Sequence, residues 1–225
     1  MITSSQANLR RKRAWAHLAE QAAEAYLTSH TVRKLQLGSG TNVLDGWLNT
    51  DLMPASDAVV YLDTTRSFPF ADATFDYVFS EHHLEHITYE EGLFALGECY
   101  RILKPGGRIR LATPDLGALL DLYTPHPDAR QQRYMRFITD HFLPGISDPQ
   151  PVFVINNAFR NWGHQFLYDR ATLQQTLTNV GFLDICFLHP GESNHQPLCQ
   201  LEMHGQFIGD EEINQFETMV VEARR

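Results

Sequence analysis

The sequence predicts an α/β fold, a mostly parallel sheet with a closing antiparallel strand and a helical lid insertion. Short apolar runs of strand length alternate with segments of helical periodicity, which is typical of parallel strands joined by crossover helices. The cluster Lys104–Gly107 ends a helix and returns the chain to a strand. The 225 residues suit one domain with a decorated edge better than two domains.

The expected elements follow in order along the chain. The first is a helix at residues 1–30 with a basic cluster at Arg10–Arg13. Gly181 is the expected C-cap of a later helix. The expected strands are Lys34–Leu37, Trp47–Thr50, Ala58–Leu62, Phe75–Ser80, Arg108–Ala112 and a closing pair, Phe182–Leu188 and Leu198–His204. The expected helices after the first are Thr88–Leu103, Leu116–Tyr123, Asp128–Phe142, Arg170–Asn179 and Glu211–Arg224.

The middle of the chain, residues 115–165, departs from the alternating pattern. Its two expected helices lead into a long loop, from Pro144 to Gly163, rich in proline, asparagine and glycine. Such a loop inside a compact domain is usually a lid or a binding segment. We expect 34–114 to bind a cofactor, 115–165 to form a lid over an acceptor, and 166–225 to close the domain. Side chains expected to contact the acceptor are Tyr123, Phe142, Phe153, Asn156, Asn157, Phe159, Arg160 and Trp162.

Composition narrows the possible partners. The formal net charge is −9, which disfavours nucleic acid because phosphate backbones are bound by clustered lysine and arginine. No apolar run approaches the ~18 residues of a membrane span. The three cysteines form no CxxC pair, which favours reduced thiols in a cytoplasmic protein.

The turn Gly38-Ser39-Gly40 after the first strand is the strongest local signal for a ligand. Glycine lets the backbone approach a ligand closely, and ligands of open α/β sheets bind at the carboxyl ends of strands. Asp51 closes the next strand, where it can accept hydrogen bonds from both hydroxyls of a ribose, and Asp63 could accept one from an adenine amine. The third glycine and long helix of a dinucleotide site are absent. A cofactor with a nucleoside but no phosphates therefore fits better.

Several ordered motifs resemble those of class I S-adenosylmethionine-dependent methyltransferases, which have a Rossmann-like fold. The closest similarity is to a subgroup with a short first helix that often accompanies sugar and polysaccharide genes. The motifs that carry this resemblance are Leu37–Gly40, Gly46–Asp51, Phe68–Ser80, Leu84–His86 and Glu98–Gly107. Together they span about residues 34–114, and such a series is far more specific than any one motif.

The resemblance implies a role for each matching residue. Gly38, Ser39 and Gly40 would lie under the methionine part of S-adenosyl-L-methionine, and Asp51 would bind its ribose. Leu62 and Asp63 would frame the adenine, and Ser80 and Glu81 would lie beside the methyl donor. Gln36 stands where the family usually has an acid, so it can hydrogen-bond the cofactor's ammonium group but cannot neutralise its charge.

Histidines after the fourth strand are candidates for acid–base chemistry. Methyl transfer to a hydroxyl requires that the oxygen lose its proton, and histidine titrates near neutral pH. The candidate bases are His82, His83 and, from the lid, His164. For His86 we expect only packing or capping of the next helix. His82-x-x-Glu85-His86 also matches a metalloprotease pattern, but that pattern requires a long helix and a further ligand, so no metal is expected.

The sequence thus predicts an S-adenosyl-L-methionine-dependent methyltransferase acting on a small polar acceptor, with an oxygen of a sugar or similar metabolite as the first choice. One alternative is a protein that binds the cofactor with little or no catalysis, because the usual acid at position 36 is missing. Another is a metal-assisted RNA 2′-O-methyltransferase, which the negative charge disfavours.

Overall fold

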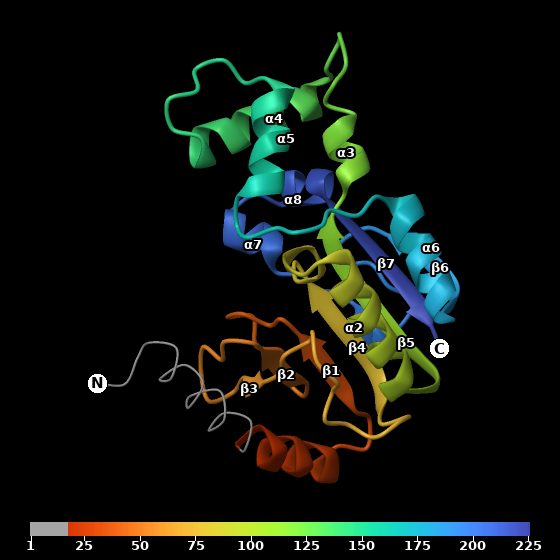
Figure 1. Cartoon of the computed structure of the whole chain (residues 1–225). Coiled ribbons are helices and arrows are strands. Elements are labelled where there is room, and N and C mark those ends of the chain that lie inside the picture. Colours follow the sequence, from red (N-terminus) through yellow and green to blue (C-terminus); the bar gives the residue numbers. More distant parts are fainter. Residues whose placement is uncertain (1–17) are drawn as a thin grey trace.

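The computed structural model describes residues 18–225, of which 18–29 form a helix. The basic cluster Arg10–Arg13 and the first part of the expected N-terminal helix lie outside the described residues. The rest of the chain forms one sheet covered by helices, with a separate group of helices beyond one end of the strands (Figure 1). Within the described residues, no helix is both long and apolar enough to cross a membrane.

The sheet has seven strands in the order β3-β2-β1-β4-β5-β7-β6. Neighbours from β3 to β5 are parallel, whereas β7 runs antiparallel to both β5 and β6. The predicted mostly parallel sheet with an antiparallel closing strand is therefore confirmed. The strands are β1 (Lys34–Leu37), β2 (Leu48–Asp51), β3 (Val60–Tyr61), β4 (Phe75–Glu81), β5 (Leu103–Pro114), β6 (Leu183–Leu188) and β7 (Thr218–Arg224).

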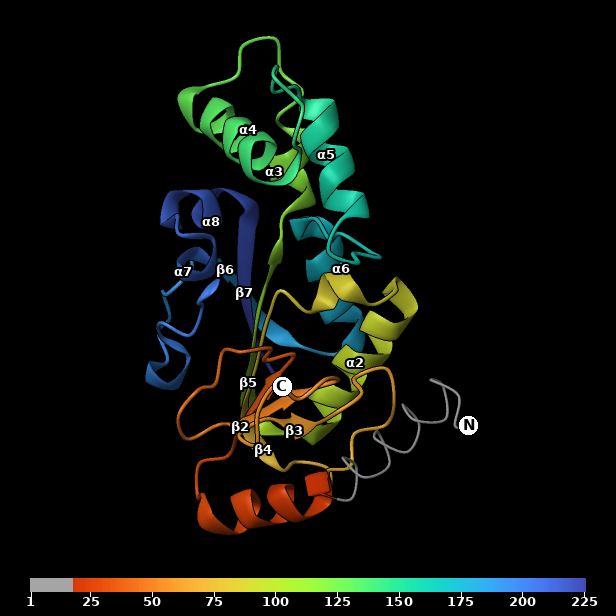
Figure 2. The same ribbon diagram turned by 90° about the vertical axis from the view of Figure 1, so that its left-hand side faces the viewer.

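Helices cover the two faces of the sheet unequally. Helices α2 (Tyr89–Ile102) and α6 (Arg170–Val180) lie on one face, and the segment around α7 (His204–Ile208) lies on the other (Figure 2). Thr88 caps α2 through a reciprocal pair of hydrogen bonds with Glu91, which satisfies two free backbone donors. Gly181 ends α6 in the left-handed conformation at φ 114°, as expected of a C-cap glycine.

The lid is a small helical unit with a core of its own. It contains α3 (Leu116–Leu120), α4 (Ala129–Phe142) and α5 (Pro151–Arg160), joined by α8 (Glu211–Glu217). The loop predicted from Pro144 to Gly163 is wrong over α5. Pro151 stands in the first turn of that helix, where a missing N–H costs nothing, and Val154 and Ala158 are buried in the lid core.

The C-terminal prediction is also wrong in part. Residues 199–203 form no strand, and the expected helix Glu211–Arg224 ends at Glu217, after which the chain becomes β7. Met219, Val220 and Val221 are completely buried between β5 and β6. This apolar, β-branched run suits a central strand, and burial on both faces outweighs the helical spacing of the charged residues around it.

Candidate functional site

The glycine turn lies at the carboxyl end of β1, as predicted. Gly38 and Gly40 have φ values of 63° and 53°, in the left-handed region that favours glycine. A Cβ atom at Gly38 would lie 2.6 Å from Cγ of His83, so no larger residue fits beside that ring. The backbone N–H of Ser39 donates to the Thr50 carbonyl at 2.9 Å, which ties the turn to β2.

Asp51 lies directly beside this turn. Its Oδ2 accepts from the Gly40 N–H at 2.9 Å, and its Oδ1 accepts from the Met53 N–H at 2.7 Å. Each carboxylate oxygen can accept a second hydrogen bond. The side chain is therefore fixed in position and still able to accept from a ligand at the strand end.

A cavity of about 230 Å³ opens over the turn. Two buried side-chain oxygens in its lining, Oε1 of Gln36 and Oγ of Ser39, have no hydrogen-bond partner among the described residues. Unpaired buried polar atoms are costly, so these two oxygens mark a place where a polar ligand fits. The cavity is lined by Gln36, Gly38, Ser39, Gly40, Thr41, Asn42, Glu81, His82, His204 and Phe207.

The structure does not bring every predicted cofactor residue to this cavity. Leu62 is packed in the main core, and the hydroxyl of Ser80 donates to the Leu37 carbonyl at 3.4 Å. Asp63 accepts from the backbone and hydroxyl of Thr65, which is a turn interaction. Glu81 lines the cavity, and its carboxylate accepts from two backbone N–H groups, those of Met203 and His204.

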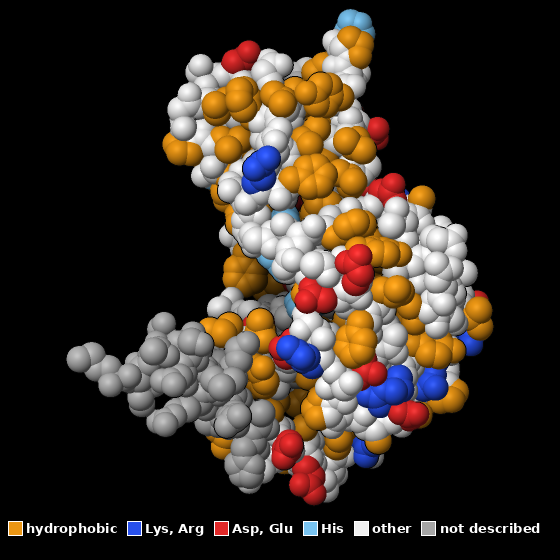
Figure 3. Space-filling view, in the orientation of Figure 1, with side chains coloured by type: hydrophobic (Ala, Val, Ile, Leu, Met, Phe, Trp, Pro, Cys, Tyr) orange, Lys and Arg blue, Asp and Glu red, His pale blue; other side chains and the backbone are white. Residues whose placement is uncertain are grey.

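A second cavity, of about 640 Å³, lies between the lid and the sheet and shares His82, His204 and Phe207 with the first. Figure 3 shows the surface hollowed in this region, with hydrophobic side chains around the hollow and histidines visible inside it. Its walls are largely apolar and aromatic, whereas its polar groups are histidines, carboxylates and one tyrosine. The lining residues are His82, Glu85, His86, Pro114, Leu119, Tyr134, Phe137, Ile138, His141, Phe142, Ala158, Trp162, His164, His204, Phe207, Ile208 and Glu217.

His82 is held by hydrogen bonds on both ring nitrogens. Nδ1 lies 3.0 Å from Oε1 of Glu85, and Nε2 lies 3.1 Å from the hydroxyl of Thr218. The Thr218 hydroxyl donates to Asn214, so its oxygen accepts from His82. Burial alone would lower the pKa of His82, but hydrogen bonding to Glu85 and nearby carboxylate charges raise it overall. Both ring nitrogens of His82 are thus engaged by protein partners.

His83 turns away from the second cavity. Its ring packs against Gly38, and Nε2 lies 2.9 Å from the hydroxyl of Thr64. Burial lowers the pKa of His83 and keeps the ring neutral at pH 7. His83 therefore lies beside the glycine turn.

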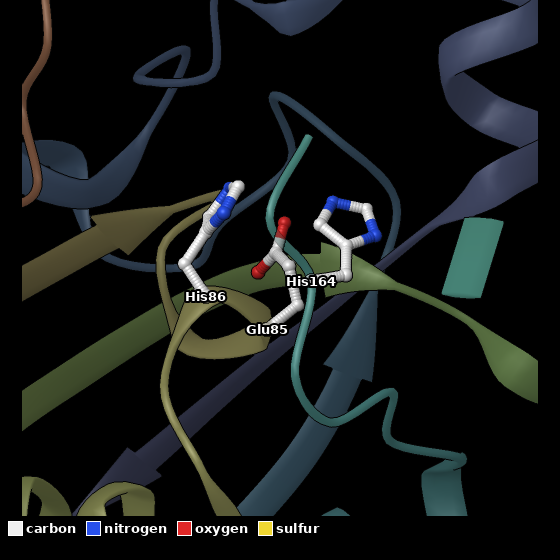
Figure 4. Close-up of side chains that lie close together, drawn as sticks. All are labelled: Glu85, His86 and His164. Atoms are coloured by element: carbon white, nitrogen blue, oxygen red, sulfur yellow. The ribbon is translucent and has the colours of Figure 1, made fainter. Parts of the chain in front are cut away.

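Glu85, His86 and His164 form a cluster at the base of the second cavity. One ligand-type atom from each residue lies within 4.8 Å of the other two. Glu85 and His86 come from the short 3-10 helix η1 (Leu84–His86), and His164 comes from the segment after α5 (Figure 4). The backbone N–H of Gln165 donates to the Glu85 carbonyl at 2.7 Å, which holds the two segments together.

The tautomer of His164 is defined by its surroundings. Nδ1 lies 2.7 Å from the Ala158 carbonyl, an acceptor, so Nδ1 carries the hydrogen and Nε2 the lone pair. Nε2 points toward Glu85 and His86 (Figure 4). Burial lowers the pKa of His164, so the ring is neutral at pH 7.

The sequence did not predict several residues of this cavity. His86 does not cap α2, because Thr88 does, and it lies instead beside Glu85 and His164. His204 and Glu217 hydrogen-bond each other at 2.9 Å. They belong to segments that the sequence predicted as a strand and a helix, and no local motif indicates a functional role for either residue. Of the expected acceptor-binding side chains in the lid, only Phe142 and Trp162 line the cavity.

Comparison with known proteins gives an independent assignment. Residues 35–111 match the family described as "Methyltransferase domain". A S-adenosylmethionine-dependent methyltransferase structure from Archaeoglobus fulgidus has a TM-score of 0.50 at 17% identity and covers 96% of this chain and 94% of that one. Another from Mesorhizobium loti has a TM-score of 0.49 at 16% identity, with 86% and 91% covered. No curated protein sequence matches the chain. The family match and the shared fold confirm the resemblance carried by the sequence motifs.

Proposed function

We propose that this S-adenosyl-L-methionine-dependent methyltransferase methylates a hydroxyl oxygen of a small acceptor bound between the lid and the sheet. The observation that carries the proposal is the pair of adjoining cavities, one over the glycine turn and one beneath the lid, which share three lining residues. The first has the features of a cofactor site. The second has room for a small molecule and contains a histidine with a free lone pair.

The residues around the first cavity fit the cofactor. Gln36 Oε1 is a buried acceptor without a partner and can receive a hydrogen bond from the ammonium group of the methionine part. Gly38 and Gly40 leave the backbone open to close approach, and Asp51 can accept from the ribose hydroxyls. None of these contacts requires a positively charged group, in agreement with a cofactor that carries no phosphate.

His164 is the proposed proton acceptor. Its Nδ1–H is used by the Ala158 carbonyl, so Nε2 is free to take the proton of an acceptor hydroxyl. When bound, S-adenosyl-L-methionine supplies a methyl carbon on sulfur, and the C–S electron pair returns to sulfur as the new C–O bond forms. We do not assign this role to His82, whose two ring nitrogens are both hydrogen-bonded, or to His83, whose ring packs against Gly38.

The acceptor class is proposed from the cavity walls. Aromatic side chains such as Phe142, Trp162 and Phe207 can stack on the apolar face of a sugar ring or a similar metabolite. The histidines and carboxylates at the base would then face its hydroxyl groups. This is the support for a hydroxylated small molecule, with a sugar as the first choice.

Two measurements on the full chain test the proposal. Calorimetry should show binding of S-adenosyl-L-methionine and S-adenosyl-L-homocysteine. A panel of sugars and other hydroxylated small molecules, assayed for methyl ethers by mass spectrometry, should include at least one acceptor. Cofactor binding without transfer to any hydroxyl compound would favour the non-catalytic alternative and overturn the proposal.

A further inference from the structure

We propose that Glu85, His86 and His164 form a binding site for a divalent first-row transition metal ion, of the Zn²⁺ or Co²⁺ type, at the base of the acceptor cavity. Only the catalytic use of the cation rests on the proposed function. Binding of the cation is a separate property that can be measured without a cofactor or an acceptor.

The three residues provide a suitable set of metal ligands. Two imidazoles and one carboxylate are a common set for Zn²⁺ and related ions, and three protein ligands leave a position open for a further oxygen ligand. The ligand-type atoms of the three residues lie within 4.8 Å of one another. The open position would face the acceptor cavity, because all three residues line it.

Two of the three proposed ligands offer unpaired donor atoms, whereas the Glu85 carboxylate already accepts from Thr113 and lies 3.0 Å from Nδ1 of His82. The ring nitrogens of His86 and Nε2 of His164 make no hydrogen bond to any of the residues that the structure describes. These unpaired nitrogens lie beside the buried carboxylate of Glu85, and a bound cation would use one nitrogen from each ring.

Two of the three proposed ligands, His164 and Glu85, are already held in place by a neighbour. The Nδ1–H of His164 donates to the Ala158 carbonyl, and the Thr113 hydroxyl donates to Oε2 of Glu85 at 3.0 Å. Such outer hydrogen bonds orient ligands in metal sites. The side chain of Gln165 donates to the His86 carbonyl at 2.8 Å and thereby links the two segments that supply the ligands.

A bound cation would change how the acceptor hydroxyl loses its proton. With the cation bound, Nε2 of His164 is a ligand and cannot accept the proton. The bound cation would make the acceptor hydroxyl more acidic, and the proton of that hydroxyl would pass to solvent water. The methyl group would still pass from sulfur to the hydroxyl oxygen, with the C–S electron pair returning to sulfur.

Cobalt absorption spectroscopy tests the site directly. Untagged full-length protein, treated with a chelator and then dialysed, should bind one equivalent of Co²⁺ with visible d–d bands, and Zn²⁺ should displace it. His86→Asn and His164→Asn should each weaken Co²⁺ affinity at least about 100-fold, a loss larger than that from outer-shell changes. His141→Asn is the matched control, because His141 lines the same cavity outside the cluster and should leave the affinity unchanged.

The outcomes separate the inference from the proposed function. Absence of the bands, or bands that survive both His86→Asn and His164→Asn, would overturn the metal site. If methyl transfer to a hydroxyl continues in the presence of a chelator and still requires His164, the imidazole of His164 is the base. Cobalt binding at the three residues without methyl transfer to any hydroxyl acceptor would support the site and reject the proposed function. Because Glu85 is buried and its variants could unfold, the two histidine variants carry the test.

Discussion

Two buried clusters of charge differ in their surroundings, one built around Arg110 of β5 and the other around Glu85 of η1. Arg110 donates to Glu202 at 2.6 Å and to Glu222 at 2.7 Å, and the three side chains are 0%, 2% and 4% exposed. At the other cluster, Glu85 is equally buried and pairs with His82, and the ring nitrogens of the adjacent His86 and Nε2 of His164 have no hydrogen-bond partner among the described residues.

Comparison of the two clusters indicates which buried charges belong to a functional site. The Arg110 cluster joins β5, β7 and the loop that carries Glu202. Arg110 also donates to the Glu192 carbonyl, while its Nη2 has no hydrogen-bond partner among the described residues. The Glu85 cluster instead borders a cavity that adjoins the one over the glycine turn. Burial, charge and an unpaired nitrogen are common to both, so the cavity beside the Glu85 cluster is what distinguishes the candidate site from a structural link.

The largest effect on stability is expected from Arg110→Met. Removing the guanidinium leaves two buried carboxylates without a partner, which typically costs about 3–5 kcal/mol. Urea unfolding should show this loss, while the folded fraction keeps its affinity for S-adenosyl-L-methionine. Arg133→Met, which removes a half-exposed ion pair with Asp210, should change stability little. Loss of cofactor affinity in the folded Arg110→Met protein would contradict the separation of the two clusters.

His164→Asn should have the opposite profile. We expect turnover to fall about 100-fold or more, because the group that activates the acceptor hydroxyl is removed. The urea midpoint and the affinity for S-adenosyl-L-methionine should change little, since His164 makes one backbone hydrogen bond and lies in the second cavity. His189→Asn, at an exposed position outside both cavities, is the control. Normal turnover in His164→Asn would show that activation of the acceptor lies elsewhere.

Asp51→Ala tests the cofactor side alone. Hydrogen bonds to a charged group contribute about 1.5–3 kcal/mol each, so the affinity for S-adenosyl-L-methionine should fall at least about tenfold in calorimetry. Cobalt affinity should not change, because Asp51 is not part of the Glu85 cluster. An unchanged cofactor affinity would reject the assignment of Asp51 to the ribose.

Gln36→Glu tests whether the missing acid matters. A carboxylate at this position can pair with the cofactor's ammonium group, and a charged hydrogen bond is roughly twice as strong as a neutral one. The affinity for S-adenosyl-L-methionine should rise about threefold to tenfold, with lower stability in the absence of cofactor because the new charge is buried. A fall in affinity would mean that Gln36 binds the cofactor through another group or does not bind it.

The smallest effect is expected from Glu98→Gln, at a partly buried ion pair with Arg101. Hydrogen bonding to Arg101 lowers the pKa of Glu98. The carboxylate therefore contributes stability above its ordinary pKa of 4.5, and this contribution is lost as pH falls through the lower folded value. In urea unfolding, the difference between Glu98→Gln and the parent chain should be present at pH 7 and shrink in acid. A difference that is the same at both pH values would contradict an electrostatic origin.

Much of the arrangement around the glycine turn could be predicted, because the sequence patterns that determine it are local. Gly38, Gly40 and Asp51 lie within fourteen positions of one another, and a strand, a tight turn and a second strand place them together with little help from the rest of the chain. The mostly parallel sheet was predicted for the same reason, since each crossover is encoded by its own alternation of apolar runs and helix breakers. The cap at Thr88 and the C-cap at Gly181 likewise depend on neighbours within a few residues.

The roles of the residues that line the second cavity could not be predicted from the sequence, because their contacts depend on tertiary structure. His82 matches the motif expected of a base, yet contacts with Glu85 and with Thr218, 136 positions away, fill both ring nitrogens. His204 and Glu217 reach the same cavity from a segment that local patterning assigned incorrectly. The physical reason is that hydrogen-bond partners, burial and pKa shifts are set by contacts between distant segments, whereas helix, strand and turn preferences are set by near neighbours. By itself the sequence therefore determined the fold class and the glycine turn, and only the folded chain decided which histidine keeps a free lone pair.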